Sequence, residues 1–162
     1  MTMTLKPLMV LFCLTFVAAG KVRKFIQVSD FHYDELYSQG SPTNNSCHFD
    51  GRYGSGSDST EAGRMGDFRC DSPKQLVKSA IQAMHKVLPD PDFILWTGDN
   101  SPHDGAGARN VTRNLKFISK WIYQVFGSRV KVIPVLGNHD SDPKDTFEDM
   151  KVDKKKARQQ YR

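Results

Sequence analysis

The chain has 162 residues, with 23 Lys and Arg against 18 Asp and Glu, a net charge of +5 and 38% hydrophobic residues. This length fits one modest domain, the charge is too low for a disordered chain, and no internal repeat suggests a solenoid. Six basic residues and one acidic residue lie in 151–162, whereas residues 21–150 hold 16 basic and 17 acidic residues. The basic surplus therefore belongs to the C-terminal tail, which argues against specific nucleic-acid binding.

The first twenty residues have the pattern of a secretory signal peptide. Lys6 precedes the apolar run 8–17, and the small residues 18–20 offer a cleavage site. The run is too short to cross a bilayer comfortably, so no transmembrane segment is expected after cleavage. The alternative interpretation is a short buried helix or a membrane anchor. A cleaved signal peptide predicts a secreted protein, extracellular or lysosomal.

The cysteines and two sequons fit an oxidising, secretory compartment. Removal of the signal peptide removes Cys13 and leaves Cys47 and Cys70, a pair that predicts one disulfide. Two unpaired thiols are the alternative. The segment between the two cysteines is rich in Gly, Ser and Asp, so a covalent link would stabilise it. The triplets that begin at Asn44 and Asn110 predict N-glycosylation sites.

The remaining sequence alternates strands and helices. Short apolar runs at 25–29, 93–97 and 131–136 predict three strands. Apolar residues at helical spacing predict helices over 72–88 and 110–126. The order β-loop-α-β-α-β predicts an α/β fold with a parallel sheet and covering helices.

Local signals predict where these elements begin and end. Ser72, followed by Pro73, is expected to cap the first helix, and Asn110 the second. Gly127 is expected to end the second helix. Pro134 places the third strand at a sheet edge or near its own end. From residue 140 onward apolar residues are few, which predicts a solvated or disordered end.

Each predicted strand runs into a polar cluster: residues 29–32, 98–100 with His103 just beyond, and 137–140. Because ligands bind at the carboxyl ends of parallel strands, these clusters are expected at one rim. Asp30 and His32 alternate with Phe31, so in an extended backbone both would point away from the core. Carboxylate, imidazole and amide groups suit divalent metals such as zinc, manganese or iron.

These clusters carry a family resemblance. DFH at 30–32, GDN at 98–100 and GNHD at 137–140 resemble the motifs of calcineurin-like metallophosphoesterases. Two longer strings, CDSP at 70–73 and DFILWTGDNSPH at 92–103, are similar to the acid sphingomyelinase-like phosphodiesterases. The resemblance implies that residues 21–149 form the N-terminal part of a catalytic domain, half of a four-layer α/β/β/α sandwich. The N-terminal pattern predicts a signal peptide at 1–20, and the composition predicts a basic disordered tail at 150–162.

The same resemblance implies the roles of individual metal ligands. Asp30 and His32 would bind one metal ion, Asp99 would bridge two, and Asn138 would bind the second. The expected cofactor is a pair of Zn²⁺ ions. Cys47 and Cys70 match an early disulfide of the family in kind.

His139 and His103 would contact the phosphate, stabilise the transition state or protonate the leaving group. The implied reaction is hydrolysis of a phosphodiester, a nucleotide or a phospholipid head group, by a metal-bridged hydroxide, in a monomeric protein. The family completes its metal site with three further histidines in its C-terminal half, whereas no histidine follows His139 here. The alternative is therefore an inactive truncated isoform or fragment that acts, if stable, as a binding or decoy module.

Overall fold

The computed structural model describes residues 23–49, 60–103, 108–141 and 144–147, together with residues 153 and 155. Three parallel strands form one sheet in the order β1-β2-β3, namely β1 (Phe25–Val28), β2 (Phe93–Trp96) and β3 (Lys131–Pro134). Helix α2 (Lys74–Val87) connects β1 to β2, and α3 (Ala108–Phe126) connects β2 to β3. The predicted α/β class and element order are confirmed.

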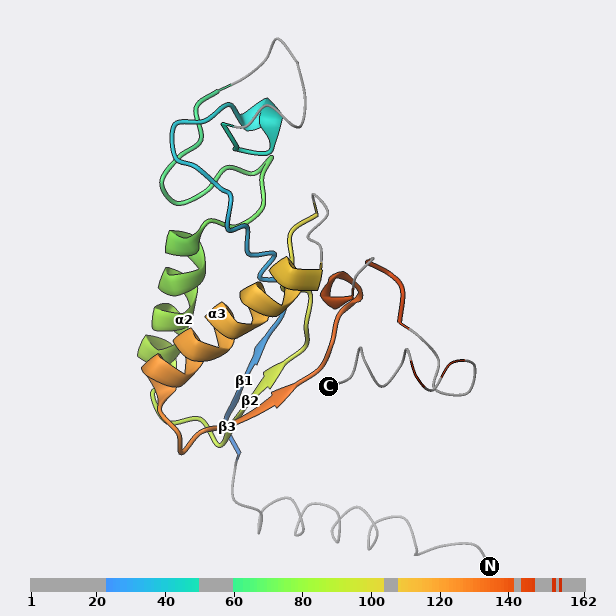
Figure 1. Ribbon diagram of the computed structural model, residues 1–162. Helices are drawn as coiled ribbons and strands as arrows, with labels where there is room; N and C mark the ends of the chain where they lie inside the picture. Colours follow the sequence, from blue (N-terminus) through green and yellow to red (C-terminus); the bar gives the residue numbers. More distant parts are fainter. Residues whose placement is uncertain are drawn as a thin grey trace, which may run out of the picture.

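Both helices cover the same face of the sheet (Figure 1). Every second residue of the central strand points toward them, so Ile94 and Trp96 are buried. The apolar stripes of α2 and α3 meet these strand residues, with Val77, Ile81, Ile118 and Ile122 almost fully buried. This one-sided packing forms the core and fixes the direction in which all three strands end.

The opposite face of the sheet is also apolar. Phe25 and Phe93 lie in register on neighbouring strands, and their rings stack with centroids 4.9 Å apart. Phe25 is 50% exposed, and Ile133 on β3 is 36% exposed. No element in the described part of the chain covers this face (Figure 1).

The observed ends of the helices and strands can be compared with those that local sequence signals predict. Gly127 ends α3 with a φ of 76°, and its N–H donates to the Tyr123 carbonyl at 2.9 Å. Pro134 is the last residue of β3, an edge strand, as expected. The two predicted helix caps are wrong. Ser72 is held instead in an isolated parallel bridge with Tyr33, and α3 begins two residues before Asn110.

Between β1 and α2 the chain makes a long excursion that extends beyond the carboxyl ends of the strands (Figure 1). Among its described residues, the excursion contains one short 3-10 helix, η1 (Thr43–Asn45). The expected disulfide between Cys47 and Cys70 is present, with the Cα atoms 6.0 Å apart. Asn44 lies in η1 and is half-buried.

A buried, hydrogen-bonded pair of side chains also holds the excursion. The His48 Nε2 lies 2.6 Å from the Asp34 carboxylate, and both side chains are almost fully buried. Burial raises the pKa of the Asp34 carboxyl, while the hydrogen bond from His48 acts in the opposite direction. His48 is therefore a structural residue of the excursion.

The predictions for the two chain termini concern residues that lie mostly outside the described part of the chain. The signal peptide at 1–20 lies outside the described residues, and so does most of the tail at 150–162. None of the described helices is long and apolar enough to span a membrane.

Removing one partner of the buried pair should destabilise the fold strongly. His48→Ala leaves the Asp34 carboxylate buried without its ring partner, so the free energy of unfolding should fall by about 3–5 kcal/mol. Urea denaturation measures this loss. The matched control is Glu35→Ala, which removes an exposed ion pair with Arg113 and should cost less than about 1 kcal/mol. Equal losses in the two variants would contradict the structural role of the pair.

Candidate active site

The turns that follow the three strands are joined through their backbones. The Asp30 N–H donates to the Gly98 carbonyl at 3.0 Å, and the His32 N–H donates to the Asp99 carbonyl at 3.1 Å. The polar clusters after β1 and β2 therefore lie side by side at one rim, as the parallel sheet predicts. Phe31, between Asp30 and His32, is buried in the core.

The backbone at this rim differs from the extended form predicted for it. Asp30 and His32 have φ values of 57° and 37°, and Asp99 has 56°, all in the left-handed region. Strand β1 ends at Val28, so the two side chains reach the rim through a turn. Asp tolerates left-handed backbone better than most residues, because its short side chain can hydrogen-bond locally.

Two glycines bring the turns after β2 and β3 into contact. A Cβ atom on Gly98 would collide with the backbone of Gly137, and a Cβ on Gly137 would collide with Asp99. Gly98 also has a φ of 89°. Only glycine allows this close approach of the two backbones.

The carboxylate of Asp140 holds the same two turns together. It accepts hydrogen bonds at 2.9–3.1 Å from three backbone N–H groups and one side-chain amide, those of Asp99, Asn100 and Gly137 and the Asn100 Nδ2. Asn100 in turn accepts from the Trp96 indole at 2.7 Å. Asp140 is therefore buried and structural, whereas the sequence placed it at the start of a solvated end.

One group of metal-binding atoms lies at the rim. Asp30, His32 and Asp99 each offer a ligand atom, and these atoms lie within 4.8 Å of one another. The His32 Nδ1 bonds to the Ser101 carbonyl at 2.9 Å, and the Asp99 Oδ1 accepts from the His139 N–H at 3.0 Å. Partners of this kind orient metal ligands in proteins, and carboxylate with imidazole suits a borderline divalent ion.

Asn138 lies in η2 (Asn138–Asp140), directly after the turn that follows β3. Its Nδ2 donates to the Asp145 carboxylate at 2.7 Å. The hydrogen bond fixes the orientation of the side chain, so the amide oxygen, which is the metal-binding atom of asparagine, faces away from Asp145. Asn138 directly precedes His139, whose N–H donates to the Asp99 carboxylate.

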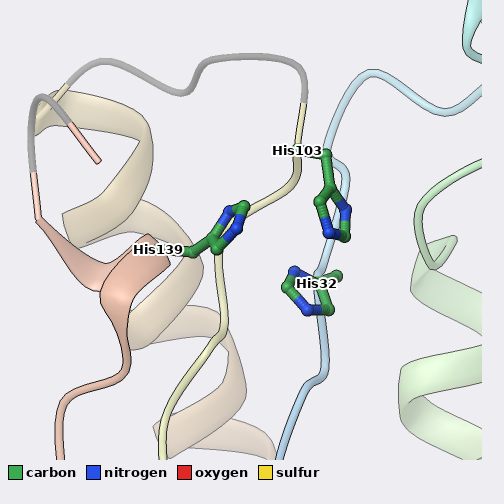
Figure 2. A group of neighbouring side chains, drawn as sticks. All are labelled: His32, His103 and His139. Carbon is green, nitrogen blue, oxygen red and sulfur yellow. The ribbon is translucent and has the colours of Figure 1, made fainter. Parts of the chain in front are cut away.

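His103 and His139 come together with His32. The centroid of the His32 ring lies 4.2 Å from that of His103 and 5.0 Å from that of His139. The His103 Nδ1 lies 2.6 Å from the Asp71 carboxylate, which also accepts from the His103 N–H at 2.7 Å. His103 and His139, the two histidines that the resemblance implies to be catalytic, therefore lie beside His32 in one site (Figure 2).

Asp71 and Asp140 also belong to this site, although the sequence indicated no role for either. Asp71 belongs to the CDSP motif, and Asp140 belongs to the GNHD motif. An acidic residue inside a motif signals a possible acceptor. The donors that it serves lie 32 and 41 residues away in the chain, and only the fold brings them close.

Comparison with known proteins decides the family. Residues 23–161 match the model of the calcineurin-like phosphoesterase family. The chain belongs to this family. Its members depend on metal ions, which agrees with the ligand group at the rim.

Several curated relatives are phosphodiesterases by name. The chain is 39% identical over 133 residues to the human acid sphingomyelinase-like phosphodiesterase 3b, covering 80% of this chain and 28% of the relative. It is 34% identical to sphingomyelinase phosphodiesterase C of Dictyostelium discoideum, covering 74% of this chain and 27% of the relative. It is 33% identical to the bovine cyclic GMP-AMP phosphodiesterase SMPDL3A, covering 76% and 27%. The chain thus spans little more than a quarter of the length of these relatives.

The rim should depend on Asp140. Asp140→Ala removes the acceptor of four donors, and each buried donor left unsatisfied costs about 1–3 kcal/mol. We expect the free energy of unfolding to fall by at least about 3 kcal/mol, with faster amide hydrogen exchange at Asp99 and Asn100. The control Asp145→Ala removes an exposed carboxylate from the same segment and should cost less than about 1 kcal/mol. Unchanged exchange at Asp99 would contradict this role of Asp140.

Proposed function

We propose that the chain contributes the metal-binding rim of a secreted phosphodiester hydrolase. The observation that carries this proposal is the convergence of Asp30, His32 and Asp99 at the carboxyl ends of parallel strands, in a member of the calcineurin-like phosphoesterases. The neighbouring His103 and His139 add two groups that can contact a phosphate.

The donor set supports two divalent ions, for which zinc is the proposed metal. Asp30 and His32 would hold one ion, Asp99 would be shared, and Asn138 would hold the second. Bound metals supply Lewis acidity and an activated water in such sites. Asp99 suits the shared position because it lies between the His32 and His139 turns, accepting from the His139 N–H through one carboxylate oxygen.

The two remaining histidines would act on the substrate. His103 has an exposed side chain, and its Nδ1 is held by the Asp71 carboxylate, so its Nε2 can face an incoming phosphate. His139 is buried beside it, with ring centroids 4.6 Å apart. Together they can donate hydrogen bonds to phosphate oxygens, and either can protonate the departing alcohol.

The proposed substrate class is a phosphodiester, either a nucleotide or a sphingomyelin-type phospholipid head group. The names of the relatives support this range, since they include sphingomyelin phosphodiesterases and cyclic GMP-AMP phosphodiesterases. The proposed protein is a secreted or lysosomal monomer, without specific affinity for nucleic acids. Its signal peptide comprises residues 1–20, and its basic tail comprises residues 150–162.

A second candidate function is a binding or decoy module without catalysis. The carboxylate-containing ligand group among the described residues consists of three residues, Asp30, His32 and Asp99. A protein of this kind could retain phosphate or metal at the rim without turning substrate over.

Hydrolysis should depend on the shared carboxylate. We expect the full chain, supplied with Zn²⁺ or Mn²⁺, to hydrolyse bis(p-nitrophenyl) phosphate, and Asp99→Ala to lower the rate at least about 100-fold, because several kcal/mol of charge stabilisation are lost. Release of p-nitrophenol measures the rate. Asp90→Ala, an exposed acidic residue between α2 and β2, is the matched control and should leave the rate unchanged. A folded chain that binds metal without hydrolysis would favour the binding module.

Secretion and glycosylation should be visible in animal cells. We expect the expressed chain to appear in the medium, to begin after Gly20, and to move faster on a gel after treatment with an N-glycosidase. Asn44→Gln and Asn110→Gln should each remove one step of this mobility shift. Terminal sequencing and electrophoresis provide the measurements. Retention of an unmodified chain in the cytosol would contradict the proposed compartment.

A further inference from the structure

A tight turn in the excursion presents one basic and one apolar side chain to solvent. The Gly66 N–H donates to the Gly63 carbonyl at 3.3 Å. Arg64 and Met65 therefore occupy the tip of this turn, and both side chains are exposed. Arg64 forms no ion pair within the described part of the chain, so its charge is free to meet a ligand.

A second tight turn follows at once and repeats this pattern. The Cys70 N–H donates to the Asp67 carbonyl at 3.0 Å. Phe68 and Arg69 therefore occupy the tip, where the Phe68 side chain is fully exposed and Arg69 pairs with Asp67. The turn is linked to Cys47 through the disulfide of Cys70, so a covalent bond holds it in place.

The first turn of α2 extends the same surface. A Cβ atom on Gly66 would lie 3.5 Å from the Pro73 ring and 3.7 Å from the Leu76 side chain, so the two tight turns lie against the beginning of the helix. Leu76 is partly exposed, and Lys74 is exposed beside it. We call this surface the turn patch, and it consists of Arg64, Met65, Phe68, Arg69, Lys74 and Leu76.

The turn patch lies at the same end of the molecule as the metal-binding rim. Figure 1 shows α2 beginning near the carboxyl ends of the strands, with the preceding segment, in green, extending beyond them. Asp71, whose carboxylate holds His103, is only three residues from Phe68. A surface that touches the turn patch would therefore also lie near the candidate active site.

Apolar side chains surrounded by cations are typical of proteins that bind to a bilayer surface. The apolar groups enter the boundary between lipid head groups and acyl chains, while the charged ends of Arg and Lys stay beside the head groups. Both the burial of apolar area and the attraction to anionic lipids strengthen such binding. Exposed apolar side chains that stand alone are common on proteins, whereas a contiguous set marks an interaction surface.

The shape of the turn patch favours a bilayer over a folded protein partner. Phe68 stands on the tip of a turn, whereas the anchor residues of protein interfaces fill well-packed pockets on the partner. Fluid lipid chains need no pocket of matching shape. The Gly66 and Cys70 N–H groups are hydrogen-bonded within their own turns, which suits contact with an apolar medium.

We propose that the turn patch docks the protein on an anionic phospholipid bilayer. Met65, Phe68 and Leu76 would enter the interface, and Arg64 and Lys74 would lie beside lipid phosphates. Docking would bring a phosphodiester carried in the bilayer close to the rim. This consequence rests on the proposed function and narrows its substrate class to lipids, whereas the binding to the bilayer does not depend on hydrolysis.

Partition of the full chain onto vesicles of equimolar phosphatidylcholine and phosphatidylserine tests the proposal. We expect Phe68→Ala to weaken partition at least about 10-fold through lost apolar burial, and Arg64→Gln about 5-fold through lost attraction. The matched controls, Val87→Ala at the end of α2 and Lys131→Gln at the start of β3, remove exposed side chains far from the carboxyl ends of the strands and should leave partition unchanged. Both chain termini are the same in every variant, so their own attraction to lipid is common to all.

Fluorescence provides a second measurement. Phe68→Trp should be quenched by vesicles whose acyl chains carry bromine, whereas Val87→Trp should be quenched no more than the parent chain, with circular dichroism confirming that the variants fold. Unchanged partition of folded Phe68→Ala would overturn the proposal, as would a lack of quenching in Phe68→Trp. Self-association without lipid that Phe68→Ala abolishes would also overturn it, because the turn patch would then join two copies of the chain. Docking without hydrolysis would contradict the proposed function and support the turn patch.

Discussion

The rim of this protein depends on one buried carboxylate. Asp140 accepts from the backbones of both turns that follow β2 and β3, at 2.9–3.0 Å. Both of its carboxylate oxygens accept from N–H donors. The β1 turn is then fixed to the β2 turn by main-chain hydrogen bonds. Three segments that are far apart in the sequence are thus held in a fixed arrangement. This arrangement sets the relative positions of the proposed metal-binding and phosphate-contacting side chains.

The excursion between β1 and α2 is part of the same arrangement. The Cys47–Cys70 disulfide closes it, and the Asp34–His48 pair fills its interior. Directly after Cys70 comes Asp71, whose carboxylate holds His103. A segment with the sequence of a polar loop therefore contributes Asp71, the residue that positions the His103 ring in the site. Loosening the excursion would release His103 without changing any residue of the rim itself.

Sequence reasoning predicted the features that arise from local patterns. The strands and helices followed from apolar periodicity, and the carboxyl-end rule placed Asp30, His32 and Asp99 together because it depends only on strand direction. The predicted caps were wrong where tertiary contacts outweighed local preference, as at Ser72, which bridges to Tyr33. The role of Asp140 was missed because most of its donors, on Asp99 and Asn100, follow a different strand and are not close to it in the sequence.

The predicted direction of Asp30 and His32 was correct for a different physical reason. Extended backbone would place both side chains on one side, yet both residues adopt left-handed backbone beyond the end of β1. Phe31 still enters the core, which anchors the turn between them. The residue types were enough to predict the site, whereas the conformation of the backbone was visible only in the structure.

The left-handed backbone at the rim lowers the stability of the fold at residues that the proposed function requires. Asp30, His32 and Asp99 each occupy a conformation that costs a side-chain-bearing residue roughly 1–2 kcal/mol compared with glycine. A chain selected only for stability would therefore favour glycine at these positions, as it has at Gly98. Keeping carboxylates and an imidazole there means that the fold tolerates a local loss, offset by the Asp140 network. Stabilising substitutions at these positions would consequently be found among the variants that have lost the site.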